Sequence, residues 1–223
     1  MNALIGDSRV RDFKSSYLGA LLSDNWCLPG VGMAAMEDLI RDLIIMHHGE
    51  DDYGEKMHVY ISVGICNITS RLKGINYEEV IFDLANANAI SSNFLTLVDH
   101  IKSFALKEGV IPVFTTIYPI ALGDWNERRL QQKKTSYLSH QQDYPAMQSK
   151  MEETIQTINK MLISTNVKTG VATPLIHKHL IHNRRNSTFK YNLLFDGCHP
   201  SATFKIKISN TLAQAIKKNR EKH

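Results

Sequence analysis

The sequence has 223 residues, of which 43% are hydrophobic, and a formal net charge of +4. This length and composition predict a single globular domain over residues 1–223, large enough to bury a substantial core. No apolar run approaches the roughly 18 residues of a membrane span, and no export signal precedes the first predicted strand. We therefore expect a cytoplasmic or otherwise intracellular protein without a membrane span.

The charge is divided unevenly along the chain. Residues 1–120 carry 9 lysines and arginines against 15 aspartates and glutamates, whereas residues 121–223 carry 17 against 7. Such asymmetry can mark an anionic partner, or it can belong to a solvated face. Charge alone permits contact with nucleic acid, but the sequence contains no recognised nucleic-acid motif or clear base-stacking platform.

Apolar runs and helical periodicities alternate through the first half of the chain. A buried strand is predicted over residues 3–5, and it stops on Gly6-Asp7-Ser8, where glycine lets the backbone turn. A helix, a short strand, a Pro-Gly turn, a second helix with one apolar face and a largely apolar strand follow. Their ranges are 12–22, 25–28, 29–32, 36–44 and 57–63.

The second half of the chain continues this alternation. It predicts a long helix that stops at Gly109, a strand, a polar connection, a further helix, a short fifth strand and a last helix opened by Pro200. Their ranges are 88–107, 110–117, 119–145, 146–163, 170–173 and 201–218. The connection is long and partly basic, and we expect it to lie beside the functional site.

Strands that alternate with helices predict a three-layer α/β/α fold with a mostly parallel, five-stranded sheet. In such sheets the ligand crevice lies beyond the carboxyl ends of the strands. Ser8, Gly32 and Asn67 follow the first three predicted strands, and a loop with Asp196 and His199 follows the fifth. These four polar elements are therefore predicted to share one edge of the sheet.

Ser8 and the segment Asp196-Gly197-Cys198-His199-Pro200 carry the candidate chemistry. Gly-Asp-Ser by itself is typical of a turn. An aspartate and a histidine three residues apart on one loop, however, can supply a base and its orienting carboxylate to a serine nucleophile. Together the two segments predict nucleophilic catalysis by Ser8.

With these segments the chain resembles the GDS-type serine esterases, the SGNH hydrolase family, whose blocks carry Ser, Gly, Asn and His. The chain resembles a divergent member of this family, and the matching blocks span nearly the whole chain in the family's order. The resemblance implies the flavodoxin-like fold of that family. The matching blocks are Gly6-Asp7-Ser8, Pro29-Gly30-Val31-Gly32, Val63-Gly64-Ile65-Cys66-Asn67 and Asp196-x-x-His199-Pro200.

Two of these blocks depart from the family's pattern. The third is usually Gly-x-Asn-Asp, whereas here the glycine stands three residues before Asn67 and Ile68 replaces the aspartate. Asn67 has a strand-end cap as its alternative role. Gly30 and Gly32 both lie in the second block, and the spacing to the following helix favours Gly32.

The resemblance implies a serine hydrolase that cleaves an acyl or acetyl ester of a small molecule, glycan or lipid, with no metal or organic cofactor. Ser8 would attack the ester carbonyl, His199 would accept the serine proton and Asp196 would orient the imidazole. The Ser8 amide, the Gly32 amide and the Asn67 side chain would form the oxyanion hole.

Two alternatives remain open. Arg9 after the serine resembles the first block of sugar O-acetyltransferases, which would pass an acyl group to a sugar with the same nucleophile. Those relatives lack a typical Asn block, which favours hydrolysis. The other alternative is a non-catalytic accessory module, because esterase-like domains also occur in proteins of mobile elements.

The chain has three cysteines, at positions 27, 66 and 198. Three are too few, and odd in number, for a disulfide framework, which suggests a reducing compartment. Cys66 and Cys198 flank the candidate site residues, but no CxxC pair supports a zinc site, so small buried thiols are expected.

A run with His177, His179 and His182 permits a metal site by its spacing. It lacks an obvious carboxylate partner, and its basic neighbours would repel a cation, which favours a solvated loop or substrate rim. Substrate choice is expected to reside in the segments 119–145 and 176–195.

Overall fold

The computed structural model describes residues 1–10, 21–47, 56–183 and 188–222. Its main sheet has four parallel strands in the order β2-β1-β3-β6. Because β1 lies between β2 and β3, the residues that follow it emerge in the middle of the carboxyl edge. The strands are β1 (Asn2–Gly6), β2 (Asp24–Cys27), β3 (His58–Ser62) and β6 (Ile111–Phe114).

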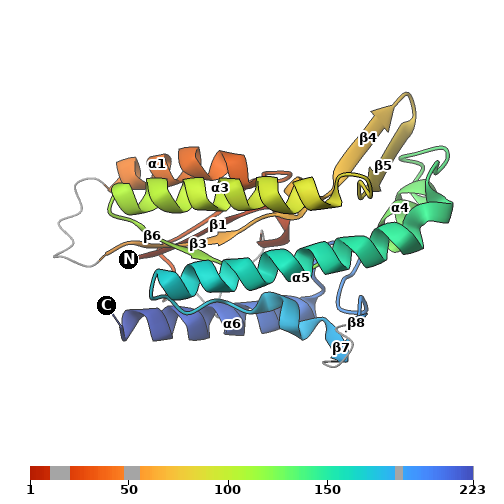
Figure 1. Ribbon diagram of the computed structural model, residues 1–223. Helices are drawn as coiled ribbons and strands as arrows, with labels where there is room; N and C mark the ends of the chain where they lie inside the picture. The colour runs from red at the N-terminus through yellow and green to blue at the C-terminus, as the bar shows by residue number, and fades with distance from the viewer. Residues whose placement is uncertain (11–20, 48–55, 184–187, 223) are drawn as a thin grey trace.

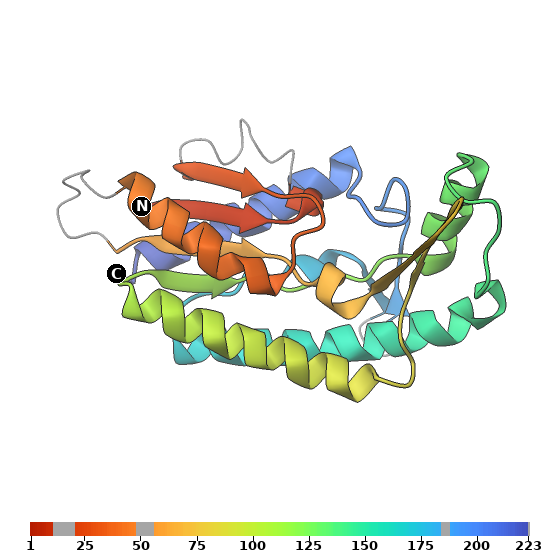
Figure 2. The same ribbon diagram turned by 90° about the horizontal axis from the view of Figure 1, so that it is seen from above.

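Helices cover both faces of this sheet, as predicted (Figures 1 and 2). Successive strand side chains point to opposite faces. Ala3 and Ile5 therefore enter a core with α1, α3 and α5, whereas Leu4 and Tyr60 enter a second core with α6. The helices are α1 (Met36–His47), α3 (Ala87–Lys107), α5 (Tyr144–Lys168) and α6 (Ala202–Arg220).

These four helices correspond to the predicted ranges 36–44, 88–107, 146–163 and 201–218. α6 begins after Ser201, whose hydroxyl accepts a hydrogen bond from the Phe204 amide, so an N-cap defines its start. The predicted helix 12–22 lies largely outside the described residues. No described helix is long and apolar enough to cross a membrane.

The predicted fifth strand at 170–173 is wrong, since the sheet ends at β6. Two asparagines of α5 occupy the edge where that strand would pair. The Asn166 carboxamide accepts from the Phe114 amide at 3.0 Å and donates to the Phe114 carbonyl at 2.7 Å. Asn159 does the same for Ile117 at 2.7 and 2.8 Å. These side chains replace a strand's hydrogen bonds, which explains the shorter sheet.

We expect Asn166→Ala to lower the free energy of unfolding by about 3 kcal/mol, because it leaves a buried N–H and a buried C=O of Phe114 without partners. Urea denaturation measures this change. The matched control is Asn93→Ala, an exposed asparagine of α3, for which we expect a change within about 0.5 kcal/mol. Equal losses in the two variants would contradict a capping role for Asn166.

The segment after β3 contains structure that the sequence pattern does not predict. An antiparallel hairpin of β4 (Ser70–Gly74) and β5 (Tyr77–Ile81) follows the short helix α2 (Ile65–Ile68). The connection 119–145 contains a helix, α4 (Leu122–Gln131). The hairpin and α4 lie side by side beyond the carboxyl edge of the sheet (Figure 1). A second short antiparallel pair is formed by β7 (Ile181–Asn183) and β8 (Thr188–Phe189).

A buried carboxylate fastens the hairpin to the start of α5. Glu79 of β5 accepts hydrogen bonds from the Tyr144 hydroxyl at 2.5 Å, from the Tyr77 hydroxyl and from the backbone amides of Ser139 and His140 at 3.1 Å. Burial raises the pKa of Glu79, but these hydrogen bonds lower it by more, to about 2. The hairpin is therefore anchored by an ionised group that stays charged over the neutral range.

Candidate active site

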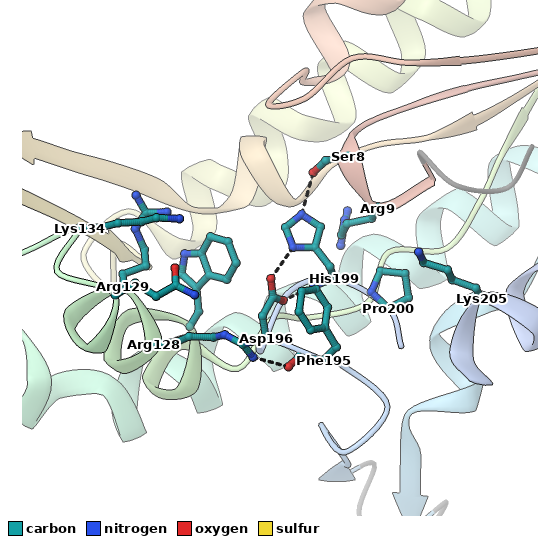
Figure 3. Close-up of a pocket in the computed structure, with 12 residues that line it drawn as sticks. Ser8, Arg9, Arg128, Arg129, Lys134, Phe195, Asp196, His199, Pro200 and Lys205 are labelled. Atoms are coloured by element: carbon teal, nitrogen blue, oxygen red, sulfur yellow. Dashed lines mark hydrogen bonds and ion pairs between the residues drawn. The ribbon is translucent and has the colours of Figure 1, made fainter. Parts of the chain in front are cut away.

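Ser8 and His199 meet at the carboxyl edge of the sheet (Figure 3). Ser8 follows β1 in a 3-10 turn, Ser8–Val10, and His199 lies in the loop that precedes α6. The distance from Ser8 Oγ to His199 Nε2 is 3.2 Å, and that from His199 Nδ1 to Asp196 Oδ2 is 2.7 Å. Residues 191 positions apart thus form one hydrogen-bonded chain of hydroxyl, imidazole and carboxylate.

The Asp196 carboxylate is fixed by its own loop. Its Oδ1 accepts from the backbone amides of Cys198 at 2.9 Å and His199 at 2.7 Å, which leaves Oδ2 for the imidazole. Burial raises the pKa of Asp196, but the hydrogen bonds from the His199 side chain and the two amides lower it by more, so it lies below its ordinary value. The carboxylate is therefore ionised at neutral pH and can hold a proton on Nδ1.

Two aromatic side chains flank the imidazole of His199. The ring centroid of Trp125 lies 5.6 Å from that of His199, and the centroid of Phe195 lies 6.3 Å from it. Gly197 brings Trp125 close, because a Cβ on Gly197, at φ +85°, would lie 2.8 Å from the Trp125 amide. Sequence reasoning missed Trp125, although it lies in the connection that was expected beside the site.

A buried ion pair lies directly beneath Ser8. The Arg9 guanidinium donates to both carboxylate oxygens of Asp7, and its Nη1 donates to the Tyr118 carbonyl at 3.0 Å. It also lies 4.5 Å from the centroid of the Tyr118 ring. Burial lowers the pKa of Arg9, but Asp7 together with the nearby Tyr118 and Cys198 raises it by more, so Arg9 remains charged. The pair fixes the turn that presents Ser8.

Gly32 and Asn67 lie against each other. A Cβ on Gly32 would lie 2.9 Å from Asn67 Oδ1 and 3.1 Å from Nδ2, so only glycine fits there without displacing the carboxamide. Asn67 Oδ1 accepts from the Met33 amide at 2.8 Å, which ties α2 to the turn after β2. Gly30 instead lines a cavity at φ +76° with open space around it. The contact with Asn67 belongs to Gly32.

Two cavities open on either side of Ser8 and His199. The first, of about 520 Å³, is bounded by α4, the Asp196 loop and the start of α6 (Figure 3). The second, of about 660 Å³, runs under the β4–β5 hairpin and includes Gly30, Cys66 and Cys198. The serine can therefore be reached by a ligand with a group on each side of the attacked atom.

The expectation of small buried thiols is wrong for Cys66, which is exposed, while Cys27 and Cys198 are partly buried. Burial raises the pKa of the Cys198 thiol to about 12, so that thiol is protonated at neutral pH. His177 is buried, and burial lowers its pKa to about 4, while His179 Nε2 lies 2.7 Å from the Thr211 hydroxyl.

Neither histidine borders the two cavities, so neither lies at the expected substrate rim, and the buried His177 does not belong to a solvated loop. The side chain of His182 lies outside the described residues. Within the described ranges, no group of three His, Cys, Asp or Glu side chains is placed to hold a metal ion.

Comparison with solved structures shows the fold. A GDSL-like lipase from Bacteroides thetaiotaomicron matches with a TM-score of 0.62 at 11% identity, covering 97% of this chain and 87% of that one. A proposed acylhydrolase from Bacteroides fragilis matches at 0.60 and 15%, covering 97% and 86%. An acetyl xylan esterase matches at 0.57 and 11%, covering 96% and 99%. No protein-family model and no curated protein matches the sequence. The chain therefore has the fold of the GDSL-like, or SGNH, hydrolases.

Proposed function

We propose that this protein is a serine hydrolase that cleaves a carboxylic ester through Ser8, His199 and Asp196. The observation that carries this proposal is the hydrogen-bonded chain from the Ser8 hydroxyl to the Asp196 carboxylate at the carboxyl edge of the sheet. The fold shared with lipases and esterases supports it. A serine hydroxyl alone is a poor nucleophile at neutral pH. An adjacent base oriented by a carboxylate activates it by accepting its proton as the oxygen attacks.

In the first half-reaction, Ser8 Oγ forms a bond to the ester carbonyl carbon while His199 Nε2 takes the serine proton. The tetrahedral intermediate then breaks its bond to the alcohol oxygen, and His199 returns the proton to the departing alcohol. Asp196 stabilises the imidazolium between these transfers and keeps the ring in position. In the second half-reaction, water attacks the acyl carbon and gives a proton to His199 Nε2. The tetrahedral intermediate then breaks its bond to Ser8 Oγ, His199 returns the proton to that oxygen, and the acid leaves.

The negative charge of each intermediate needs preorganised donors. In the described part of the chain, the Ser8 and Gly32 backbone amides have no hydrogen-bond acceptor, so both are free to donate. Asn67 uses Oδ1 for the Met33 amide, which leaves its Nδ2 as a third donor. Gly32 and Asn67 line neither cavity, but Gly30 and Cys66, next to them in the chain, line the second cavity together with Ser8, and on this ground we assign the oxyanion hole to these three groups.

The transferase alternative rests on Arg9. Its guanidinium donates to Asp7 and to the Tyr118 carbonyl, and this buried role accounts for an arginine after the serine without an acceptor sugar. Hydrolysis is therefore the better-supported function, with the sugar acceptor as an outcome of the test.

We expect a fluorophosphonate probe to label Ser8, with the label found by mass spectrometry on the peptide that contains it. Labelling should vanish in Ser8→Ala and fall by at least about 100-fold in rate in His199→Ala, because the base that activates the hydroxyl is gone. A folded protein that stays unlabelled and turns over no ester would favour the non-catalytic module. Faster acyl transfer to an added sugar than to water would favour the acetyltransferase.

A further inference from the structure

The rim of the two cavities is strongly cationic. The β4–β5 hairpin contributes Arg71 and Lys73, α4 contributes Arg128 and Arg129, and Lys134 follows α4. Among the described residues, the acidic side chains that line the same two cavities are Asp7 and Asp196. Asp7 is bound to Arg9, and Asp196 is bound to His199. The charge of Asp7 is therefore balanced by Arg9, whereas Asp196 leaves one negative charge to set against the cationic side chains of the rim.

One further carboxylate compensates part of this charge. Glu78 of β5 pairs with Arg71 at 3.2 Å and with Arg129, so one negative charge is shared by two arginines. Lys73 and Lys134 are exposed and form no ion pair within the described part of the chain. Asp124 and Glu127 line a neighbouring cavity, which shares Arg128 and Asp196 with the first cavity but does not include Ser8. A positive excess thus remains on both sides of Ser8.

Two of the arginines are held by aromatic rings at the site. The Arg128 guanidinium lies 4.9 Å from the centroid of Phe195 and donates to the Phe195 carbonyl at 2.6 Å. Arg129 lies 5.6 Å from the centroid of Trp125, the side chain that also flanks His199. Arginines held in this way lose less conformational entropy when they bind an anion, and they retain N–H groups for a carboxylate or phosphate.

We propose that the ester substrate is anionic: it carries a carboxylate or phosphate group on its acyl or alcohol part, and the cationic rim binds that group while Ser8 attacks the carbonyl. This inference rests on the proposed function. Like charges lining a cleft with low-dielectric walls focus the field, so an anion is both attracted and oriented there. A neutral ester of the same shape gains nothing from the rim.

The test compares matched ester pairs that differ by one charge. For the acyl part the pair is 4-nitrophenyl hemisuccinate and its methyl ester, and for the alcohol part it is 4-acetoxybenzoate and its methyl ester. After correction for uncatalysed hydrolysis, we expect the anionic member of at least one pair to have a kcat/KM at least about tenfold higher at low salt. The preference should disappear between about 0.01 M and about 1 M salt, because screening shortens the reach of surface charges from about 30 Å to about 3 Å.

Charge-reversal variants locate the binding side. Lys134→Glu changes the cavity beside α4, and Lys73→Glu changes the cavity under the hairpin. We expect one of them to lower the ratio of anionic to neutral kcat/KM by about tenfold or more, which tells which cavity binds the anion. The ester pair that shows the preference tells whether the acyl or the alcohol part carries the charge. The matched control is Lys160→Glu on the exposed face of α5, away from both cavities, which should leave the ratio unchanged.

Each outcome has a separate meaning. If neither member of either pair is hydrolysed, the proposed function fails. If the neutral and anionic members of both pairs are hydrolysed with equal kcat/KM, the inference of an anionic substrate is wrong while the proposed hydrolysis stands. The same holds if Lys160→Glu lowers the ratio as much as the rim variants do. If the protein shows no preference but binds a single-stranded oligonucleotide through Lys134, the rim serves nucleic acid and the proposal is wrong.

Discussion

Asp196→Asn is expected to lower kcat for ester hydrolysis by about 10,000-fold while the protein stays folded. The loop geometry gives the reason. Asp196 Oδ1 accepts from the Cys198 and His199 amides, so the oxygen of an asparagine would take that place and its NH₂ group would face His199 Nδ1. An NH₂ group there donates to Nδ1, which forces the imidazole proton onto Nε2. Nε2 then has no lone pair for the Ser8 proton.

The matched control is Asp124→Asn, which removes one carboxylate from the first turn of α4, beside a neighbouring cavity that does not contain Ser8. We expect this variant to change kcat by less than about threefold. Steady-state kinetics measures both variants, and thermal unfolding shows whether each is folded. If Asp196→Asn retained most of its activity, Asp196 would be a loop-forming residue and not the partner of a catalytic histidine.

The sequence predicts the residues of the site better than their surroundings. Ser8 follows a short buried strand, and the rule for the carboxyl edge places it there. Asp196 and His199 share one loop, but the strand from which their place at that edge was predicted is absent from the sheet. Trp125 and the basic rim depend on where α4 and the hairpin pack. The sequence of the connection 119–145 does not reveal that packing, because its many charged residues leave no strong helical spacing of apolar side chains.

The hairpin did leave a signal in the sequence. Its strands are joined by Ile75 and Asn76, and Asn76 adopts φ +55°, a conformation that asparagine tolerates better than most residues. No signal in the sequence shows that the fifth strand is absent, because Val171 follows α5 with the turn signal and apolar character of a strand. Its place in the ladder is taken by Asn159 and Asn166, whose partners are more than 40 residues away. Such tertiary hydrogen bonds override local propensity.

Asn67→Ala is expected to lower kcat by about 100- to 1000-fold and to leave KM nearly unchanged, because a donor to the oxyanion strengthens only as negative charge develops. In the described part of the chain, Asn67 Nδ2 has no acceptor, while Oδ1 is occupied by the Met33 amide and the carboxamide lies flat against Gly32. The side chain is thus held by one end and free to donate at the other. The measurement is steady-state kinetics on a neutral ester.

Alanine also removes the hydrogen bond to Met33, so a second variant must separate catalysis from structure. Asn67→Asp keeps an oxygen for the Met33 amide but replaces the free NH₂ with an oxygen that repels the oxyanion. We therefore expect Asn67→Asp to unfold at nearly the wild-type temperature and to lose at least as much kcat as Asn67→Ala. If Asn67→Asp were instead active and only Asn67→Ala impaired, Asn67 would serve as a strand-end cap, and the oxyanion would rely on the Ser8 and Gly32 amides.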